Sequence, residues 1–181
     1  MKNRIDFSDN NHELIMDVSR RRFLGARAPG PAPFRPPWSV AEAAFLDRCT
    51  RCDDCVKACP TGLLQRGEGG YPEADFSATA CTFCGDCAKA CASGAIGRDT
   101  TQPPWSFGVV IGEGCLAAQN VECRICGEAC DAGAIRFRPR IGGVPLPDVD
   151  LAACTGCGAC IAPCPVVAVT RKALPSALEQ S

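Results

Sequence analysis

Sixteen cysteines are the residues whose type and spacing point to chemistry in this 181-residue chain. They form four groups of four, and three of the groups read C-x2-C-x2-C-x3-C. Group 3 keeps the last two spacings but has seven residues between its first two cysteines. No cysteine lies outside the groups, so all sixteen are candidate metal ligands. In chain order, groups 1 to 4 are Cys49, Cys52, Cys55 and Cys59; Cys81, Cys84, Cys87 and Cys91; Cys115, Cys123, Cys126 and Cys130; and Cys154, Cys157, Cys160 and Cys164.

This spacing is typical of [4Fe–4S] clusters in bacterial ferredoxins, in which four thiolates converge on one iron–sulfur cube. A structural zinc site uses paired C-x2-C units and leaves a third closely spaced cysteine unused. Disulfides need an oxidising compartment, and cysteines two residues apart bridge poorly to each other. We therefore expect four [4Fe–4S] clusters. The third is the least regular, because seven residues separate Cys115 from Cys123. In the alternative interpretation, Cys115 is a buried structural thiol and only three clusters are complete.

The spacing leaves two ways of sharing the ligands open. With exchange between consecutive groups, Cys91 completes the first cluster and Cys59 the second, and groups 3 and 4 follow the same rule. A nested exchange would pair group 1 with group 4 and group 2 with group 3. Both arrangements satisfy the spacing.

The elements that must position these groups are short. We expect an α+β fold of two tandem ferredoxin-like βαββαβ di-cluster units, each preceded by a Pro-Pro-Trp-Ser header, at 36–39 and 103–106. Strands are predicted at 108–112, 134–138 and 166–170, helical turns at 56–59 and 88–91, and glycine-rich links at 65–72 and 141–148. The predicted boundaries are an N-terminal tail at 1–37, a first unit at 38–97, a second unit at 98–174 and a C-terminal tail at 175–181.

Composition narrows the class of protein. A formal net charge of −1 argues against a nucleic-acid-binding protein, and no apolar run approaches the roughly 20 residues of a membrane span. Sixteen thiolates add sixteen negative charges and four oxidised clusters return roughly eight, so the holo protein carries about −9. Large apolar residues are scarce, so cluster binding should supply much of the folding free energy.

The N-terminal segment contains Ser19-Arg-Arg-Arg-Phe-Leu24, which looks like a twin-arginine export motif. Prolines and further arginines follow it in place of the apolar stretch that an export signal needs. We therefore expect a basic tail on a cytoplasmic protein. The single histidine, His12, lies in this tail and is expected to be a solvated residue rather than a ligand.

Between residues 36 and 171 the chain resembles the NapF family, ferredoxin-type iron–sulfur proteins of periplasmic nitrate reductase systems. The resemblance rests on RPPWS before group 1, CTRCDDCVKAC, LLQRGEGGYP at 63–72, the stretched group 3 with VECR, and CTGCGACIAPCPV. It implies a cytoplasmic protein that binds NapA, the catalytic subunit, before export. The implied role is maturation of that subunit, by cluster assembly or electron supply.

Three functions compete for this sequence. The first is an accessory protein that matures a nitrate reductase, and the second is a general electron carrier between redox enzymes. The third is a regulatory or structural module that uses its clusters only to fold. We do not expect an enzyme, because the sequence has no phosphate-binding loop, no histidine near the cysteines and no obvious nucleophile besides them.

Overall fold

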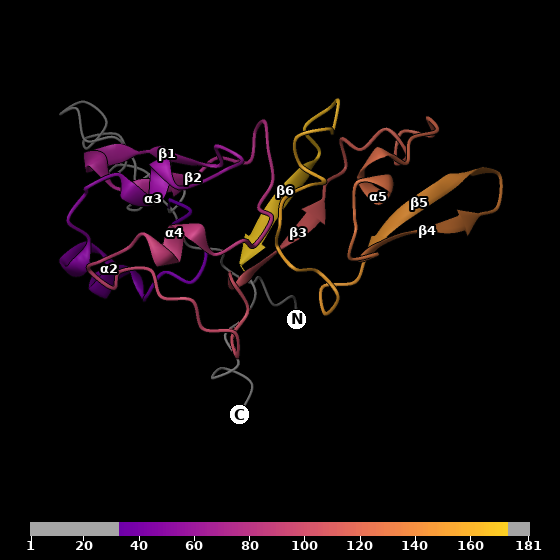
Figure 1. The fold of residues 1–181 in the computed structure, drawn as a ribbon. Helices are drawn as coiled ribbons and strands as arrows, with labels where there is room; N and C mark the ends of the chain where they lie inside the picture. Colours follow the sequence, from indigo (N-terminus) through magenta and orange to yellow (C-terminus); the bar gives the residue numbers. More distant parts are fainter. Residues whose placement is uncertain (1–32, 174–181) are drawn as a thin grey trace, which may run out of the picture. The chain divides into compact units, whose positions relative to one another are not determined.

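The computed structural model describes residues 33–173, in which short helices and strands alternate with long loops (Figure 1). The predicted N-terminal motif and His12 lie outside these described residues, as do positions 174–181. In chain order the elements are α2 (Glu42–Arg48), α3 (Asp54–Lys57), β1 (Leu64–Arg66), a 3-10 turn (Glu68–Gly70), β2 (Pro72–Ala74), α4 (Asp86–Lys89), β3 (Phe107–Ile111), α5 (Ile125–Glu128), β4 (Ile135–Arg140), β5 (Gly143–Val149) and β6 (Val169–Ala173).

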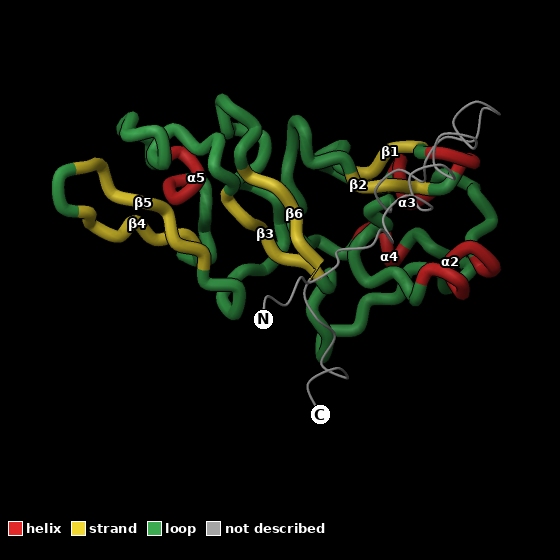
Figure 2. The backbone as a smooth tube through the Cα atoms, turned by 180° about the vertical axis from the view of Figure 1, so that it is seen from behind, coloured by secondary structure: helices red, strands yellow, loops and turns green. Residues whose placement is uncertain are grey.

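The strands form three separate two-stranded antiparallel sheets, visible from behind in Figure 2. In the second half of the described chain, β4 and β5 make a hairpin with Ile135 opposite Val149. The strands that precede and follow this hairpin, β3 and β6, pair with each other, with Val109 opposite Arg171. The second half therefore has an inner hairpin and an outer strand pair around its two cysteine groups.

The first half keeps the inner hairpin, β1 with β2, but reduces the outer pair to a single bridge between Ser39 and Ile96. Two backbone hydrogen bonds form this bridge, from Val40 N to Ala95 O (3.1 Å) and from Gly97 N to Trp38 O (3.1 Å). The two prolines before Trp38 have no N–H to donate, and α2 starts two residues after Val40. The strand pairing therefore ends before Trp38 on one side and after Val40 on the other.

Several predicted bounds differ from the observed ones. The helical turns predicted at 56–59 and 88–91 begin two residues earlier, as α3 and α4, and end before the fourth cysteine of each group. The strand predicted at 166–170 lies at 169–173, because Val167 N donates to Cys164 O (3.2 Å) in a turn. The glycine-rich links are the turns and strands of the two inner hairpins.

The two Pro-Pro-Trp-Ser headers contact each other. Trp38 N donates to Pro104 O (2.8 Å), and Trp105 Nε1 donates to Arg35 O (3.0 Å). The Phe83 ring lies edge-on to both tryptophans, with ring centroids 6.3 Å and 6.0 Å away. The headers thus join the two halves, a contact that the sequence repeat did not predict.

Residues 34–37 were predicted to end the N-terminal tail, but three of their side chains are buried or packed in the structure. Pro36 and Pro37 are among the most completely buried side chains, and Phe34 packs against the first core. The first core also includes Phe45, Leu63 and Phe76, while Val109, Ile135 and Val169 contribute to the second. Ile161 packs against both cores, so they are in contact.

Candidate metal centres

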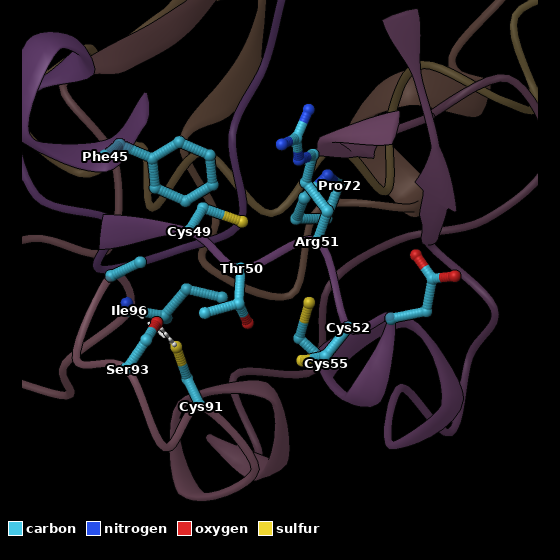
Figure 3. Close-up of a pocket in the computed structure, with 12 residues that line it drawn as sticks. Phe45, Cys49, Thr50, Arg51, Cys52, Cys55, Pro72, Cys91, Ser93 and Ile96 are labelled. Atoms are coloured by element: carbon cyan, nitrogen blue, oxygen red, sulfur yellow. Dashed lines mark hydrogen bonds between the residues drawn. The ribbon is translucent and has the colours of Figure 1, made fainter. Parts of the chain in front are cut away.

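Each of four pockets is lined by four cysteines. Figure 3 shows the first pocket, in which thiols from group 1 face the Cys91 thiol across a shared space. We number the sites by the group that supplies three of the four thiols. The cysteines are Cys49, Cys52, Cys55 and Cys91 at site 1; Cys59, Cys81, Cys84 and Cys87 at site 2; Cys115, Cys123, Cys126 and Cys164 at site 3; and Cys130, Cys154, Cys157 and Cys160 at site 4.

This grouping corresponds to exchange of the fourth cysteine between consecutive groups. Cys59 follows group 1 but lines site 2, and Cys91 follows group 2 but lines site 1. The second half repeats the pattern with Cys130 and Cys164. The nested alternative does not match the pockets. Cys115, for which the sequence also allowed the role of a structural thiol, lies with the other three thiols of site 3.

Left-handed backbone turns bring the first three cysteines of groups 1, 2 and 4 to one side. In these groups the residues two and four positions after the first cysteine all have positive φ angles. They are Arg51 and Asp53, Phe83 and Gly85, and Gly156 and Gly158. Such a conformation costs a non-glycine residue about 1–2 kcal/mol, so the surrounding structure must stabilise it. The guanidinium of Arg66 makes an ion pair with the carboxylate of Asp53, which helps to hold the turn of group 1.

Group 3 reaches its pocket by another route. The seven residues between Cys115 and Cys123 form a turn in which Gln119 N donates to Cys115 O (3.1 Å) and Val121 N to Leu116 O (2.9 Å). The chain then reverses at Asn120, which has φ +61° and whose side-chain oxygen accepts a hydrogen bond from Val144 N (3.2 Å). The insertion therefore forms an ordered turn that returns Cys123 to the site.

The third cysteine of each group is the most deeply buried thiol of its site. Cys55, Cys87, Cys126 and Cys160 are between 6% and 8% exposed. In groups 1 to 3 this cysteine lies in the first turn of α3, α4 or α5. Burial raises the pKa of Cys55 to about 11 and that of Cys87 to about 12. These thiols must lose protons to bind metal, so loading the sites releases protons.

The fourth cysteines lie in a second repeated turn. The residue three positions later has a positive φ in every group, and its amide donates to the cysteine carbonyl over 2.9 to 3.3 Å. These residues are Gly62, Gly94, Gly133 and Val167. In three groups a following amide donates to the sulfur: Ile96 N to Cys91 Sγ (3.4 Å), Ala134 N to Cys130 Sγ (3.3 Å) and Ala168 N to Cys164 Sγ (3.2 Å).

These amides favour the thiolate form that a metal requires. Burial alone would raise the pKa of Cys164, but hydrogen bonds from the backbone amides after it outweigh burial and lower the pKa below its ordinary value. The pKa of Cys91 is lowered in the same way, with the Ser93 side chain contributing a hydrogen bond. N–H···S hydrogen bonds of this kind also tune the reduction potential of an iron–sulfur cluster.

The donor sets fit iron–sulfur clusters. All sixteen cysteines are free thiols, and soft thiolate ligands select iron–sulfur clusters, zinc or copper(I). Within residues 33–173, no three His, Cys, Asp or Glu side chains are grouped as a single-ion site requires. Each pocket instead surrounds a space with four thiols, the ligand number of a [4Fe–4S] cube.

Three features of the sites were missed at the sequence level. Cys81 N donates to Cys157 O (2.9 Å), a contact between groups 2 and 4. Phe76 packs against Gly158 of group 4, and Arg171 lies over the Phe34 ring. All three are long-range contacts without a local pattern, although the two glycines of group 4 signal a close approach of other atoms.

Comparison with protein families identifies the class. Residues 34–96 match a family described as a 4Fe-4S dicluster domain, and residues 121–168 match a second family with that description. The chain is therefore a tandem dicluster iron–sulfur protein. Two such domains and sixteen cysteines account for four [4Fe–4S] clusters, which confirms the predicted cofactor.

Relatives narrow the class further. The chain is 45% identical over 162 residues to the ferredoxin-type protein NapF of Escherichia coli K12, covering 89% of this chain and 98% of the relative. It is 49% identical over 140 residues to NapF of Haemophilus influenzae, covering 77% and 79%. The methylamine utilization ferredoxin-type protein MauM of Paracoccus denitrificans is 35% identical over 159 residues, covering 78% and 70%. The chain belongs to the NapF family of ferredoxin-type proteins, which confirms the resemblance seen in the sequence.

Among the helices of the described part of the chain, none combines the length and the apolar character that a bilayer crossing demands.

Proposed function

We propose that the sixteen cysteines hold the four clusters as the pockets group them, with the fourth ligand exchanged within each half. The single observation that carries this assignment is that every pocket is lined by four thiols, three from one group and one from its neighbour. We also propose that both halves derive from a βαββαβ unit. The order β3, α5, β4, β5, β6 of the second half supports this in all but the second helix, where residues 159–163 form a turn, and the first half is a form of the unit with reduced outer strands.

The assignment is tested at its least regular site. Cys115→Ala should lower the iron content from about 16 to about 12 atoms per chain, because site 3 loses a ligand. The matched control is Cys49→Ala, which removes the first cysteine of group 1 and should lower the iron content equally. An unchanged iron content in Cys115→Ala alone would show that Cys115 is a structural thiol.

We propose that the protein acts in the cytoplasm and is not an enzyme. In this proposal it binds NapA, the catalytic subunit of periplasmic nitrate reductase, and assists its maturation before export by assembling or reducing its cluster. The identity of 45–49% to NapF proteins over most of the chain supports this role. Among the residues that line the four pockets, the ionisable side chains besides the thiols are Arg51 and Asp53 of the first pocket, and Asp53 is held in an ion pair by Arg66.

The maturation role predicts a defect in the partner. NapA isolated from the cytoplasm of cells that lack this protein should contain less iron than NapA from complemented cells. Complementation with the Cys115→Ala variant shows whether this role requires site 3. Restored iron content in NapA with this variant would mean that the protein is required but that site 3 is not. Normal iron content in NapA from the deletion strain would contradict a role in cluster assembly.

Binding itself can be measured with purified proteins. A holo protein of about −9 should bind NapA through a basic patch, with an on-rate that falls as salt rises. Anaerobic surface plasmon resonance between 50 and 300 mM NaCl measures this dependence. An on-rate independent of salt would exclude electrostatic steering.

A second candidate function is general electron transfer between redox enzymes. The similarity to MauM favours it, because a relative of this chain is named for methylamine utilization rather than nitrate reduction. Normal NapA iron content together with impaired electron flow to the reductase in the deletion strain would support this carrier role instead.

A further inference from the structure

The two halves meet at their cysteine groups. The backbone N–H of Cys81, at site 2, donates to the carbonyl oxygen of Cys157, at site 4, over 2.9 Å. Among the backbone hydrogen bonds of the described residues, it is the one that joins cysteines of different halves. Sites 2 and 4 are therefore in direct backbone contact.

Packing around this hydrogen bond fixes the approach of the two loops. A Cβ atom on Gly158 would overlap the ring of Phe76, and one on Gly156 would lie 3.1 Å from the carbonyl oxygen of Phe107. Group 4 therefore carries glycine at the positions where group 1 carries Arg51 and Asp53. The close contact explains why these two positions of group 4 carry no side chain, whereas the charged residues of group 1 are exposed or partly exposed.

Aromatic contacts hold the halves at this distance. The Phe76 ring lies 5.5 Å from that of Trp105 and 5.9 Å from that of Phe107, measured between centroids. The guanidinium carbon of Arg171, on β6, lies 3.3 Å from the ring centroid of Phe34 and 5.1 Å from that of Phe76. Such pairs stabilise the contact between the halves when they are shielded from water.

Within each half, the exchanged ligand connects the two sites. Cys55 of site 1 and Cys59 of site 2 are four residues apart on the segment that contains α3, and Cys87 and Cys91 are related in the same way around α4. Cys126 and Cys130 repeat this relation between sites 3 and 4 in the second half. An α-helix rises only about 1.5 Å per residue, so these short helices keep the two cysteines of each pair close together along the chain.

We propose that the four sites form one series in the order site 1, site 2, site 4, site 3, joined across the halves by the Cys81–Cys157 backbone contact. Sites 2 and 4 are the inner members, and sites 1 and 3 are the ends at which external partners exchange electrons. One electron crossing the junction oxidises one inner site and reduces the other, with no bond broken and no proton moved. This order rests on the proposed assignment of thiols to clusters.

Two double variants test the order with electron paramagnetic resonance. The inner-only protein, Cys52→Ala with Cys123→Ala, removes the end sites and leaves one site in each half. The outer-only protein, Cys84→Ala with Cys157→Ala, removes the inner sites and also leaves one in each half. All four changes affect the second cysteine of a group, so the two variants are matched, and each should bind about eight iron atoms.

After reduction with dithionite, the inner-only protein should show a resolved spin–spin interaction between its two centres. The outer-only protein should show two magnetically isolated centres, because its sites lie at opposite ends of the series. Interaction in the outer-only protein, or equal spectra for both variants, would overturn the proposed order.

A pair of glycine variants tests the junction with all ligands present. Gly158→Ala places a Cβ against Phe76, whereas Gly133→Ala adds one in a similar left-handed turn with no atom within 4 Å. We expect the spin–spin broadening of the reduced protein to fall in Gly158→Ala and to match the wild type in Gly133→Ala, with about 16 iron atoms in both. Identical spectra at full iron content would overturn the junction.

The results of these experiments distinguish a failure of the proposed site order from a failure of the proposed function. A wild-type protein with about 16 iron atoms that binds NapA, but whose inner-only variant lacks the interaction, disproves the order alone. An iron content of about 12 in the wild type disproves the assignment of thiols on which the order rests.

Discussion

In the second half of the molecule, β3 and β6 pair along five residues around the cluster sites, whereas in the first half the bridge from Ser39 to Ile96 takes their place. Both halves nevertheless group their cysteines in the same way. The outer strands are therefore not needed to define a site. The first half compensates with buried Pro36 and Pro37 and with an aromatic core around Phe45 and Phe76.

The two halves also show how far the buried core of each depends on cluster ligands. In the second core the buried residues are Val109, Cys126, Ile135, Cys160 and Val169, so two of the five are candidate ligands. The first core is larger, but it too includes two buried thiols. Neither half has an apolar core independent of its ligands, so regular strands alone should not stabilise the second half.

The largest expected effect is that of cluster removal. Anaerobic chelation of the iron should unfold both halves, because the buried thiols lose the metal that holds them together and an isolated two-stranded hairpin is marginally stable in water. Amide hydrogen exchange measures this result strand by strand. Persistent protection of the β3 and β6 amides in the apo protein would show that the outer strands stabilise the second half by themselves.

The next effect concerns the contact between the halves. Phe76→Ala should reduce the free energy of unfolding by about 3–5 kcal/mol, because the ring is 2% exposed and packs against both halves. Phe137→Ala, a change in the partly buried ring on β4, is the matched control and should cost less than about 2 kcal/mol. Anaerobic guanidinium titration followed by visible absorbance compares the two. Equal losses would mean that the contact between the halves contributes no extra stability.

The smallest effect lies in the turn after each fourth cysteine. Three of these turns have glycine at φ +60° to +70°, but the fourth has Val167 at φ +50°, with 74% of its surface exposed. Val167→Gly should raise the free energy of unfolding by up to about 1 kcal/mol, because relief of strain exceeds the entropic cost of glycine.

The neighbouring Val166→Gly is the control for this change, since Val166 has no positive φ. It should destabilise the protein by at least about 0.5–1 kcal/mol, through the entropic cost of glycine and the loss of a side chain that lines site 3. The same titration measures both variants. Destabilisation of equal size in both would show that the strain at Val167 is negligible.

The sequence predicted the members of the cysteine groups because their spacing is local. The apolar runs of the second half were also placed within a few residues, as β3 and β4. β5 was missed because Pro145 and Pro147 interrupt its pattern, although a two-stranded sheet consists only of edges and tolerates proline there. The predicted position of β6 was wrong because Val166 and Val167 continue an apolar run that belongs to a turn.

Features that depend on distant partners could not be read from local patterns. The choice between consecutive and nested exchange depends on which groups share a half of the fold, and the sequence spacing allows both. The hydrogen bond from Cys81 to Cys157 uses backbone atoms, which carry no sequence signal. The glycines of group 4 gave the only local sign of this contact, and their meaning depends on Phe76 and Phe107.

The central claim is that four thiols from two neighbouring groups hold one [4Fe–4S] cluster at each of four sites. Native mass spectrometry of the protein purified without oxygen tests it most directly, because it counts iron and sulfide on the intact chain. We predict a single species with about 16 iron and 16 sulfide atoms. A dominant species with zinc in place of iron, or with fewer than four clusters after anaerobic reconstitution, would contradict it.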